Sequence, residues 1–249
     1  MQKIIISIII PSFNVENTIF MVIENISKIM NESKIIYEIL AINDGSDDRT
    51  LEVLHDSKKL NSKLKIISYN KNKGKGYAIK QGVLKSNGDI VLFIDGDLDI
   101  TLQSILDFIK ELDDYDLVIG SKLHLKSEIE STFSRQCLSR IFNFVVRVFT
   151  GLKIKDTQVG LKAGDGTILR KIFQLMTING FAFDVEMLTI SSIMNLKIKE
   201  MPVKIKLNKK FRFYHSMKMF QEVVKISWKS KVLHSYQKIN MTVNLEGKK

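Results

Sequence analysis

Three aspartates stand at alternate positions near the middle of the chain, in the stretch DIVLFIDGDLDI at residues 89–100. They are Asp95, Asp97 and Asp99, and they follow an apolar run at 90–94. Carboxylates this close repel one another unless a cation lies among them. Hard oxygen ligands suit Mg²⁺ or Mn²⁺, which usually take further ligands from substrate phosphates. Asp-x-Asp alone is a weak signal, because acidic turns are common and most are simply solvated.

The elements that would position these aspartates alternate regularly over the first 120 residues. The pattern predicts strands at 3–10, 37–44, 64–70, 89–95 and 115–122, and helices at 19–30, 46–60, 74–86 and 102–112. Repeated strand–helix–strand units imply an α/β fold with a doubly wound, mostly parallel sheet and helices on both faces. The second half predicts helices at 133–150, 167–177, 183–195 and 216–239, and a strand-like stretch at 196–207.

Four of the predicted strands end in polar segments. These are PSFN at 11–14, NDGS at 43–46, DGDLD at 95–99 and GSK at 120–122. In open parallel sheets, ligands bind beyond the carboxyl ends of the strands. The sequence therefore predicts one binding edge that holds the three aspartates.

Composition limits the class of protein and its surroundings. The chain has 249 residues, a formal net charge of +11 and one cysteine, Cys137. It suits a single domain without an internal disulfide, in a reducing compartment. The apolar opening runs into PSFN and reads as a first strand, and no apolar run reaches the roughly 18–20 residues that span a bilayer. We expect a cytoplasmic protein. The positive charge fits nucleic acid, anionic lipid, phosphorylated small molecules or a merely lysine-rich surface.

Eight segments, in order along nearly the whole chain, resemble family-2 glycosyltransferases, most closely the branch that makes dolichyl-phosphate glucose or mannose. They are SIIIPSFNVENTI, YEILAINDGSDDRT, NKGKGYAIKQG, GDIVLFIDGDLD, VIGSK, DTQVGLK, FAFDVEML and EMPVKI. The resemblance implies a GT-A fold, a nucleotide-sugar donor, Mg²⁺ or Mn²⁺, and inversion at the anomeric carbon of the sugar.

The resemblance also implies a set of donor-binding residues. Asp44 would read the base, Lys75 would face the phosphates or the donor sugar, and Asp99 would be a further metal ligand beside Asp95 and Asp97. Arg212 and Lys218 are six residues apart, the spacing of a basic pair that grips the donor diphosphate in relatives. The donor-binding set is Pro11, Phe13, Asn14, Asp44, Lys75, Asp95, Gly96, Asp97, Arg212 and Lys218.

The implied acceptor is a polyprenyl phosphate, which is already an anion near neutral pH and needs cations more than a general base. Lys122, Arg135 and Arg140 are the candidates, and we assign Asp97, Arg135 and Lys122 to the catalytic set. The two arginines lie on the predicted apolar helix 133–150, which either enters a membrane surface or is an ordinary core helix. Asp184 and Glu186 are the alternative: one would act as the base that a carbohydrate acceptor requires.

Several positions depart from the pattern of the dolichyl branch. Val15 stands where a glutamate is common, Asn43 where an aspartate is usual, and Lys122 where an arginine is frequent. The residues KAGDG after DTQVGL also depart from the branch's usual continuation. None of these changes affects Asp95 or Asp97, so activity is expected, while the identity of the donor stays open between UDP-glucose and GDP-mannose.

The sequence thus favours an inverting hexosyltransferase that acts on a polyprenyl phosphate, as a peripheral protein on the cytoplasmic face of a membrane. Residues 1–215 would form the GT-A domain, and 216–249 a basic amphipathic helix and tail packed on the domain or the membrane. The alternative is a family-2 enzyme that adds sugar to a glycan or surface polysaccharide. A nucleotidyltransferase would carry a glycine-rich phosphate loop, and a nucleic-acid-binding module an RNP-type aromatic motif; neither is present.

Overall fold

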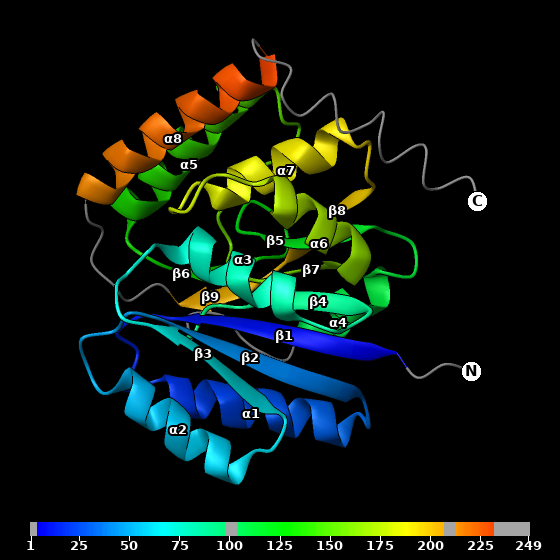
Figure 1. Ribbon diagram of the computed structural model, residues 1–249. Coiled ribbons are helices and arrows are strands. Elements are labelled where there is room, and N and C mark those ends of the chain that lie inside the picture. Colours follow the sequence, from blue (N-terminus) through cyan, green and yellow to red (C-terminus); the bar gives the residue numbers. More distant parts are fainter. Residues whose placement is uncertain (1–3, 98–103, 207–212, 232–249) are drawn as a thin grey trace.

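The computed structural model describes residues 4–97, 104–206 and 213–231 of the chain. A seven-stranded sheet runs through its centre in the order β3-β2-β1-β4-β7-β5-β8 (Figure 1). Its strands are β1 (Ile5–Ser12), β2 (Ile36–Asp44), β3 (Leu64–Tyr69), β4 (Ile90–Phe93), β5 (Leu117–Ser121), β7 (Lys162–Asp165) and β8 (Ile198–Pro202). The described helices are α1 (Ile19–Glu32), α2 (Thr50–Leu60), α3 (Lys75–Lys85), α4 (Ile105–Glu111), α5 (Phe133–Thr150), α6 (Gly166–Leu175), α7 (Phe183–Ile193) and α8 (Phe213–Lys231).

Helices cover both faces of the sheet, as the sequence predicted. Figure 1 shows α1 and α2 on one side and α3, α6 and α7 on the other. Two separate apolar cores result, and neighbouring residues of one strand enter different cores: Ile8 faces α1, whereas Ile9 faces α3. Burial on both faces explains why the strands lack polar alternation. The α/β class and the mostly parallel sheet are confirmed.

One strand of the sheet was not predicted. β7 runs antiparallel between β4 and β5, with Ala163 opposite both Leu92 and Val118. Its sequence, KAGD, is too short and too poor in β-branched residues to read as a strand. The strand places the start of β7, rather than its end, beside the carboxyl end of β4.

Two boundaries also differ from the prediction. The stretch 196–207 is divided: β8 pairs with β5, and β9 (Lys204–Lys206) pairs with β6 (Glu128–Glu130) in a separate two-stranded sheet. Helix α2 begins at Thr50 instead of residue 46, because Asp48 accepts backbone hydrogen bonds from Thr50 (2.9 Å) and Glu16 (3.2 Å) in the preceding turn.

Helices α5 and α8 lie side by side at one end of the molecule (Figure 1). The rings of Phe149 and Phe220 meet edge to face with centroids 5.8 Å apart, and the Ser227 hydroxyl donates to the Phe149 carbonyl at 2.6 Å. The described part of the predicted C-terminal helix therefore packs on the rest of the chain, and its continuation past 231 lies outside the described residues. Within the described ranges, no helix is long and apolar enough to cross a membrane.

Helix α3 can approach the sheet closely because residue 82 is glycine. A Cβ at Gly82 would overlap methyl groups of Ile9 and Ile42. We expect Gly82→Val to lower the free energy of unfolding by about 1–3 kcal/mol through overpacking, measured by urea denaturation. Lys85→Val places the same side chain on an exposed position of α3 and is the control. Equal stability of both variants would contradict the close packing.

Candidate active site

The loops after β1 and β2 are joined by hydrogen bonds. The Asn14 backbone N–H donates to the Ser46 hydroxyl at 3.1 Å, and the Asn14 side-chain oxygen accepts from the Asp47 N–H at 3.0 Å. Asn14 has a left-handed backbone (φ 52°), which asparagine tolerates. Next to it, Phe13 is 43% exposed and Pro11 is partly buried. The structure thus brings together the predicted donor residues of these two loops.

Asp44, the last residue of β2, holds the entrance of α3. Its two carboxylate oxygens accept the backbone N–H groups of Lys73 (2.8 Å) and Gly74 (3.0 Å). The side chain is buried, so these bonds fix the loop that carries Lys75. Asn43, beside it, donates to the Ser68 hydroxyl at 3.0 Å, a bond that an aspartate carboxylate could not donate.

The carboxylate of Asp95, two residues beyond β4, forms an ion pair with the ammonium of Lys75. Lys75 Nζ is 2.6 Å from Asp95 Oδ1, and the side chains of Lys75 and Asp95 are 18% and 27% exposed. Burial disfavours the charged form of Lys75, but Asp95 and Asp184 outweigh it, and the pKa of Lys75 is raised. A Cβ at Gly160 would overlap the Asp95 carboxylate, so a side chain at residue 160 would displace it.

The other two members of the predicted metal site are Asp97 and Asp99. Asp97 is partly buried and close enough to Lys75 to contribute to the raised pKa of its ammonium. The buried Gly96 between the two aspartates accepts a hydrogen bond from the Thr18 hydroxyl at its carbonyl (2.7 Å), which anchors the turn. Asp99 lies outside the described residues.

A second, deeper ion pair lies beside the first. Lys162 Nζ is 2.7 Å from Asp184 Oδ1, with side-chain exposures of 0% and 4%. Burial lowers the pKa of Lys162 and raises that of Asp184, in each case against the pull of the partner's charge. Lys75 also repels Lys162, and Asp95 repels Asp184, so the two pairs form one electrostatic unit.

Lys122, a predicted acceptor-binding cation, is held by the buried Asp156. Its Nζ is 3.1 Å from Asp156 Oδ2, and its backbone N–H donates to the same oxygen at 2.8 Å. Burial opposes the negative charge of Asp156, yet Lys122 and backbone donors lower the pKa of this carboxyl. Asn143 of α5 donates to Asp156 (3.2 Å) and accepts from the Thr157 N–H (3.2 Å), which links α5 to this loop.

The two candidate bases have structural partners. Glu186 is fully buried and accepts the backbone N–H groups of Thr177 (2.9 Å) and Ile178 (2.7 Å), so it holds the loop between α6 and α7. Asp184 is engaged by Lys162. Both carboxylates are therefore almost inaccessible to solvent, and the structure does not present either of them on the surface of the site.

Four remaining candidates are basic. Arg140 is exposed on α5. Arg135 belongs to the first turn of α5, and its side chain is outside the described part of the structure; Arg212 lies wholly outside it. Lys218 is exposed on α8, one turn before Glu222. Glu222 was not predicted: its carboxylate accepts the Ala182 N–H at 3.1 Å, next to the start of α7.

Sequence reasoning assigned no role to Asp156, Gly160 or Lys162, although it singled out the segment DTQVGLK that contains all three. The available signal was a charged residue at each end of a short apolar stretch, which is uncommon in a buried segment. The pairing of each charge depends on partners 22 to 34 residues away, and spacing along the chain does not show such contacts.

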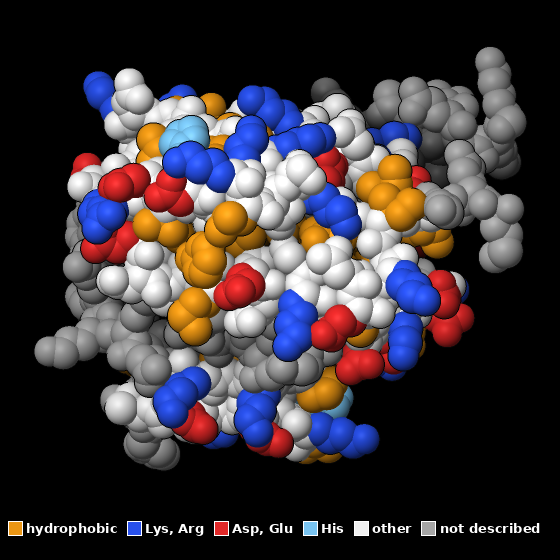
Figure 2. Space-filling model, turned by 90° about the horizontal axis from the view of Figure 1, so that it is seen from below, with side chains coloured by type: hydrophobic (Ala, Val, Ile, Leu, Met, Phe, Trp, Pro, Cys, Tyr) orange, Lys and Arg blue, Asp and Glu red, His pale blue; other side chains and the backbone are white. Residues whose placement is uncertain are grey.

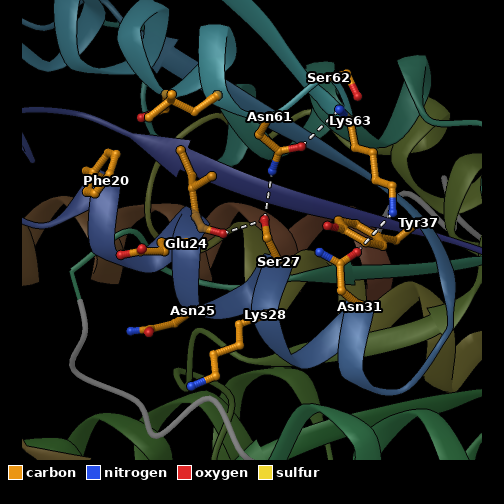
Figure 3. Close-up of a pocket in the computed structure, with 13 residues that line it drawn as sticks. Phe20, Glu24, Asn25, Ser27, Lys28, Asn31, Tyr37, Asn61, Ser62 and Lys63 are labelled. Atoms are coloured by element: carbon orange, nitrogen blue, oxygen red, sulfur yellow. Dashed lines mark hydrogen bonds between the residues drawn. The ribbon is translucent and has the colours of Figure 1, made fainter.

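A pocket of about 760 Å³ lies elsewhere, between α1 and the end of α2 (Figure 3). Its polar side chains bond with one another: Asn61 donates to Ser27 (2.7 Å), and Lys63 donates to Asn31 (3.1 Å) while lying over the Tyr37 ring. Tyr37 and Lys63 mark the amino ends of β2 and β3. The pocket runs along α1 from Phe20 to Asn31, and none of the predicted site residues lines it.

The fold and the aspartates at the carboxyl edge define a class of protein. The family model described as Glycosyl transferase family 2 matches residues 7–173, and the chain belongs to this family. A solved glucosyl-3-phosphoglycerate synthase from Mycobacterium tuberculosis, in complex with Mn²⁺, UDP and glucosyl-3-phosphoglycerate, has a TM-score of 0.69 at 19% identity, over 91% of this chain and 79% of that one. The fold resembles these GT-A structures.

Curated relatives are more similar in sequence. A dolichyl-phosphate beta-glucosyltransferase of Dictyostelium discoideum is 30% identical over 246 residues, which cover 92% of this chain and 75% of that protein. The enzyme of the same name from Saccharomyces cerevisiae is 30% identical over 223 residues, 81% of this chain and 67% of its own length. The chain thus matches two thirds to three quarters of these two relatives.

Mg²⁺ or Mn²⁺ fits the residues at this edge. Among the residues that the structure describes, no three acidic, histidine or cysteine side chains come together as a complete metal cluster. Asp95 and Asp97 supply two carboxylates, and the Lys75 ammonium already places one positive charge 2.6 Å from Asp95. One or two carboxylates, with remaining ligands from substrate phosphates, is the usual arrangement for Mg²⁺. Related structures contain Mn²⁺ or Mg²⁺ with UDP.

The contact between Gly160 and Asp95 is testable by substitution. We expect Gly160→Ala to displace the Asp95 carboxylate and weaken binding of UDP with Mn²⁺ by about tenfold or more, measured by calorimetry. Gly151→Ala is the control, since a Cβ there meets nothing within 4 Å. Because residue 151 has a left-handed backbone (φ 76°), alanine there should lower the free energy of unfolding without affecting UDP binding. Unchanged binding in a folded Gly160→Ala variant would contradict the role of this glycine.

Proposed function

We propose that this protein is an inverting, metal-dependent hexosyltransferase that moves a hexose from a nucleotide sugar to a polyprenyl (dolichyl) phosphate. The observation that carries the proposal is the convergence of Asp44, Lys75, Asp95 and Asp97 on one edge of the sheet. The names of the curated relatives support glucose as the sugar and dolichyl phosphate as the acceptor, and UDP-glucose is bound in a related structure. UDP-glucose is therefore favoured over GDP-mannose.

The donor would lie across the carboxyl ends of β1, β2 and β4. Pro11, Phe13 and Asn14 would line the nucleoside pocket with Asp44, and Gly96 would let the diphosphate approach the backbone. Asp95 and Asp97, with Asp99, would hold the divalent metal on the diphosphate. Arg212 and Lys218 would add positive charge around the diphosphate. These groups stabilise the negative charge that the leaving nucleotide diphosphate develops.

In the reaction, an oxygen of the lipid phosphate forms a bond to the anomeric carbon as the bond to the nucleotide diphosphate breaks on the opposite side. The acceptor phosphate is already an anion, so no proton has to be removed. This fits a site in which Asp184 and Glu186 are engaged by Lys162 and by backbone N–H groups. Lys122, Arg135 and Arg140 would hold the acceptor phosphate, with Asp156 fixing Lys122.

The surface formed by α5 and α8 suits a lipid acceptor. Large apolar side chains are exposed on both helices: Leu138, Ile141, Phe144 and Val148 on α5, and Phe220, Val224 and Trp228 on α8. Exposed basic residues accompany them, namely Arg140, Arg147, Lys218 and Lys225. Apolar residues that enter the interface, with cations that attract anionic head groups, are the pattern of peripheral membrane binding. We infer attachment to the cytoplasmic face of a membrane.

The face on the α1–α2 side is different. In Figure 2 it carries acidic and basic side chains interspersed, with small apolar groups between them. Ion pairs such as Arg49–Glu52 (2.9 Å) and Lys59–Asp56 (2.8 Å) lie on α2. Mixed charge of this kind gives little net attraction to an anionic membrane, so the α5–α8 face suits the membrane better than the α1–α2 face.

The metal site is tested by Asp97→Ala and by chelation. We expect this variant to abolish transfer from UDP-glucose to a short polyprenyl phosphate, because metal and diphosphate contacts are lost together. Its thermal unfolding should stay close to that of wild type. EDTA should abolish transfer by the wild type, and added Mn²⁺ should restore it. Asp113→Ala, at an exposed acidic position, is the control. Full activity of Asp97→Ala, or of wild type in excess EDTA, would refute the proposal.

The acceptor and the membrane surface are tested by co-sedimentation with liposomes. We expect binding to anionic but not neutral liposomes, weakening as salt rises because exposed charges are screened over about 10 Å at 0.1 M. Phe144→Ser should weaken binding, whereas Phe20→Ser, which alters an exposed phenylalanine on α1, should not. Binding to neither liposome, with transfer only to a soluble sugar, would instead favour a glycan or polysaccharide acceptor and Asp184 or Glu186 as base.

A further inference from the structure

Two ion pairs meet behind the proposed donor site, and their four groups come from four separate segments. Lys75 opens α3, Asp95 follows β4, Lys162 opens β7, and Asp184 lies in the first turn of α7. The Lys75–Asp95 pair is partly open to solvent, while the Lys162–Asp184 pair is closed off. The open pair faces the binding edge, and the closed pair lies beneath it.

Aromatic rings make the surroundings of both ammonium groups apolar. Lys75 Nζ is 5.9 Å from the centroid of the Phe183 ring, and Lys162 Nζ is 5.9 Å from that of Phe93. The two rings are themselves 6.3 Å apart. Charges attract one another more strongly in such a medium than in water, so the way in which the four groups pair has a large effect on the site.

Three carboxylates act on the charge of Lys75, those of Asp95, Asp184 and Asp97. Asp95 attracts it most, and Asp184 also contributes to the raised pKa of the Lys75 ammonium. Lys162 is 2.7 Å from Asp184 and compensates its charge. Without Lys162, Asp184 would be a buried, uncompensated carboxylate, and the nearest mobile cation able to neutralise it would be Lys75.

We propose that the Lys75 ammonium is the resident counter-ion of Asp95 and that a divalent cation must displace it to bind Asp95. Lys162 keeps the Lys75 ammonium on Asp95 by neutralising Asp184. This proposal rests on the proposed function in one respect, the role of Asp95 as a metal ligand. Lys75 and Lys162 are thereby assigned as positioning residues for the metal. The displaced ammonium becomes available to the donor diphosphate.

The arrangement makes metal binding depend on the donor. In the free protein, Mn²⁺ competes with a covalently tethered ammonium and binds weakly. When a nucleotide diphosphate is present, its negative charge attracts the displaced Lys75, and the same Mn²⁺ binds tightly. Metal and donor therefore enter together, and the free protein keeps its carboxylates neutralised in the absence of both.

The experiment measures Mn²⁺ binding by the full chain without nucleotide, through the electron paramagnetic resonance signal of free Mn²⁺. We expect Lys75→Met to bind Mn²⁺ about tenfold more tightly than wild type, because the competing cation is gone. Lys162→Met should also bind Mn²⁺ more tightly, since Lys75 moves to Asp184. A purely structural role of Lys162 would leave the affinity unchanged or lower it.

The double variant Lys162→Met/Asp184→Asn restores the balance of charge and should return to the wild-type affinity. Lys85→Met, at an exposed position of the same helix as Lys75, is the control for a general loss of positive charge and should bind as wild type. If Lys162→Met does not fold, Lys75→Met and the double variant still decide the question, because Lys75→Met leaves only the partly exposed Asp95 without its cation and the double variant leaves no buried charge unpaired.

Addition of UDP distinguishes a failure of the counter-ion proposal from a failure of the proposed function. We expect UDP to strengthen Mn²⁺ binding by wild type, and to do so less in Lys75→Met. If UDP strengthens Mn²⁺ binding by wild type, but Lys75→Met and wild type have the same Mn²⁺ affinity without UDP, the counter-ion proposal is wrong and the donor site stands. If wild type binds no Mn²⁺ with or without UDP, both proposals are wrong.

Discussion

A carboxylate at the end of a buried strand needs a cation beside it, and much of this protein is arranged around that need at Asp95. The ammonium of Lys75 meets it at 2.6 Å. To bring Lys75 there, Asp44 fixes the entrance of α3 through two backbone N–H groups. To make room on the other side, residue 160 has no side chain. Three segments that are distant in sequence are therefore constrained by one charge.

The same principle recurs away from Asp95. Asp156 is buried and is compensated by Lys122, by backbone N–H groups and by Asn143 of α5. Glu222 of α8 accepts a backbone N–H beside α7. These polar contacts connect each of the two helices of the proposed membrane surface to a loop next to the site.

The parts of the fold that follow local rules could be predicted from the sequence. Five strands and the helices between them show apolar runs and helical periodicity, and the polar segments after the strands indicated the binding edge. β7 could not be predicted, because Gly164 and Ala163 carry almost no strand preference and the strand forms by pairing with β4 and β5. The pairing of Lys162 with Asp184 follows from β7, so it was missed together with the strand.

The segment before β7 limits how this protein can change in evolution. It is fixed at three points, because Asp156 pairs with Lys122, Gly160 lies against Asp95, and Lys162 pairs with Asp184. Inserting or deleting one residue between Asp156 and Lys162 would break at least one of these three contacts. The segment 156–162 should therefore keep its length among relatives that retain this chemistry, whereas the exposed turn at Gly151 is free to lengthen.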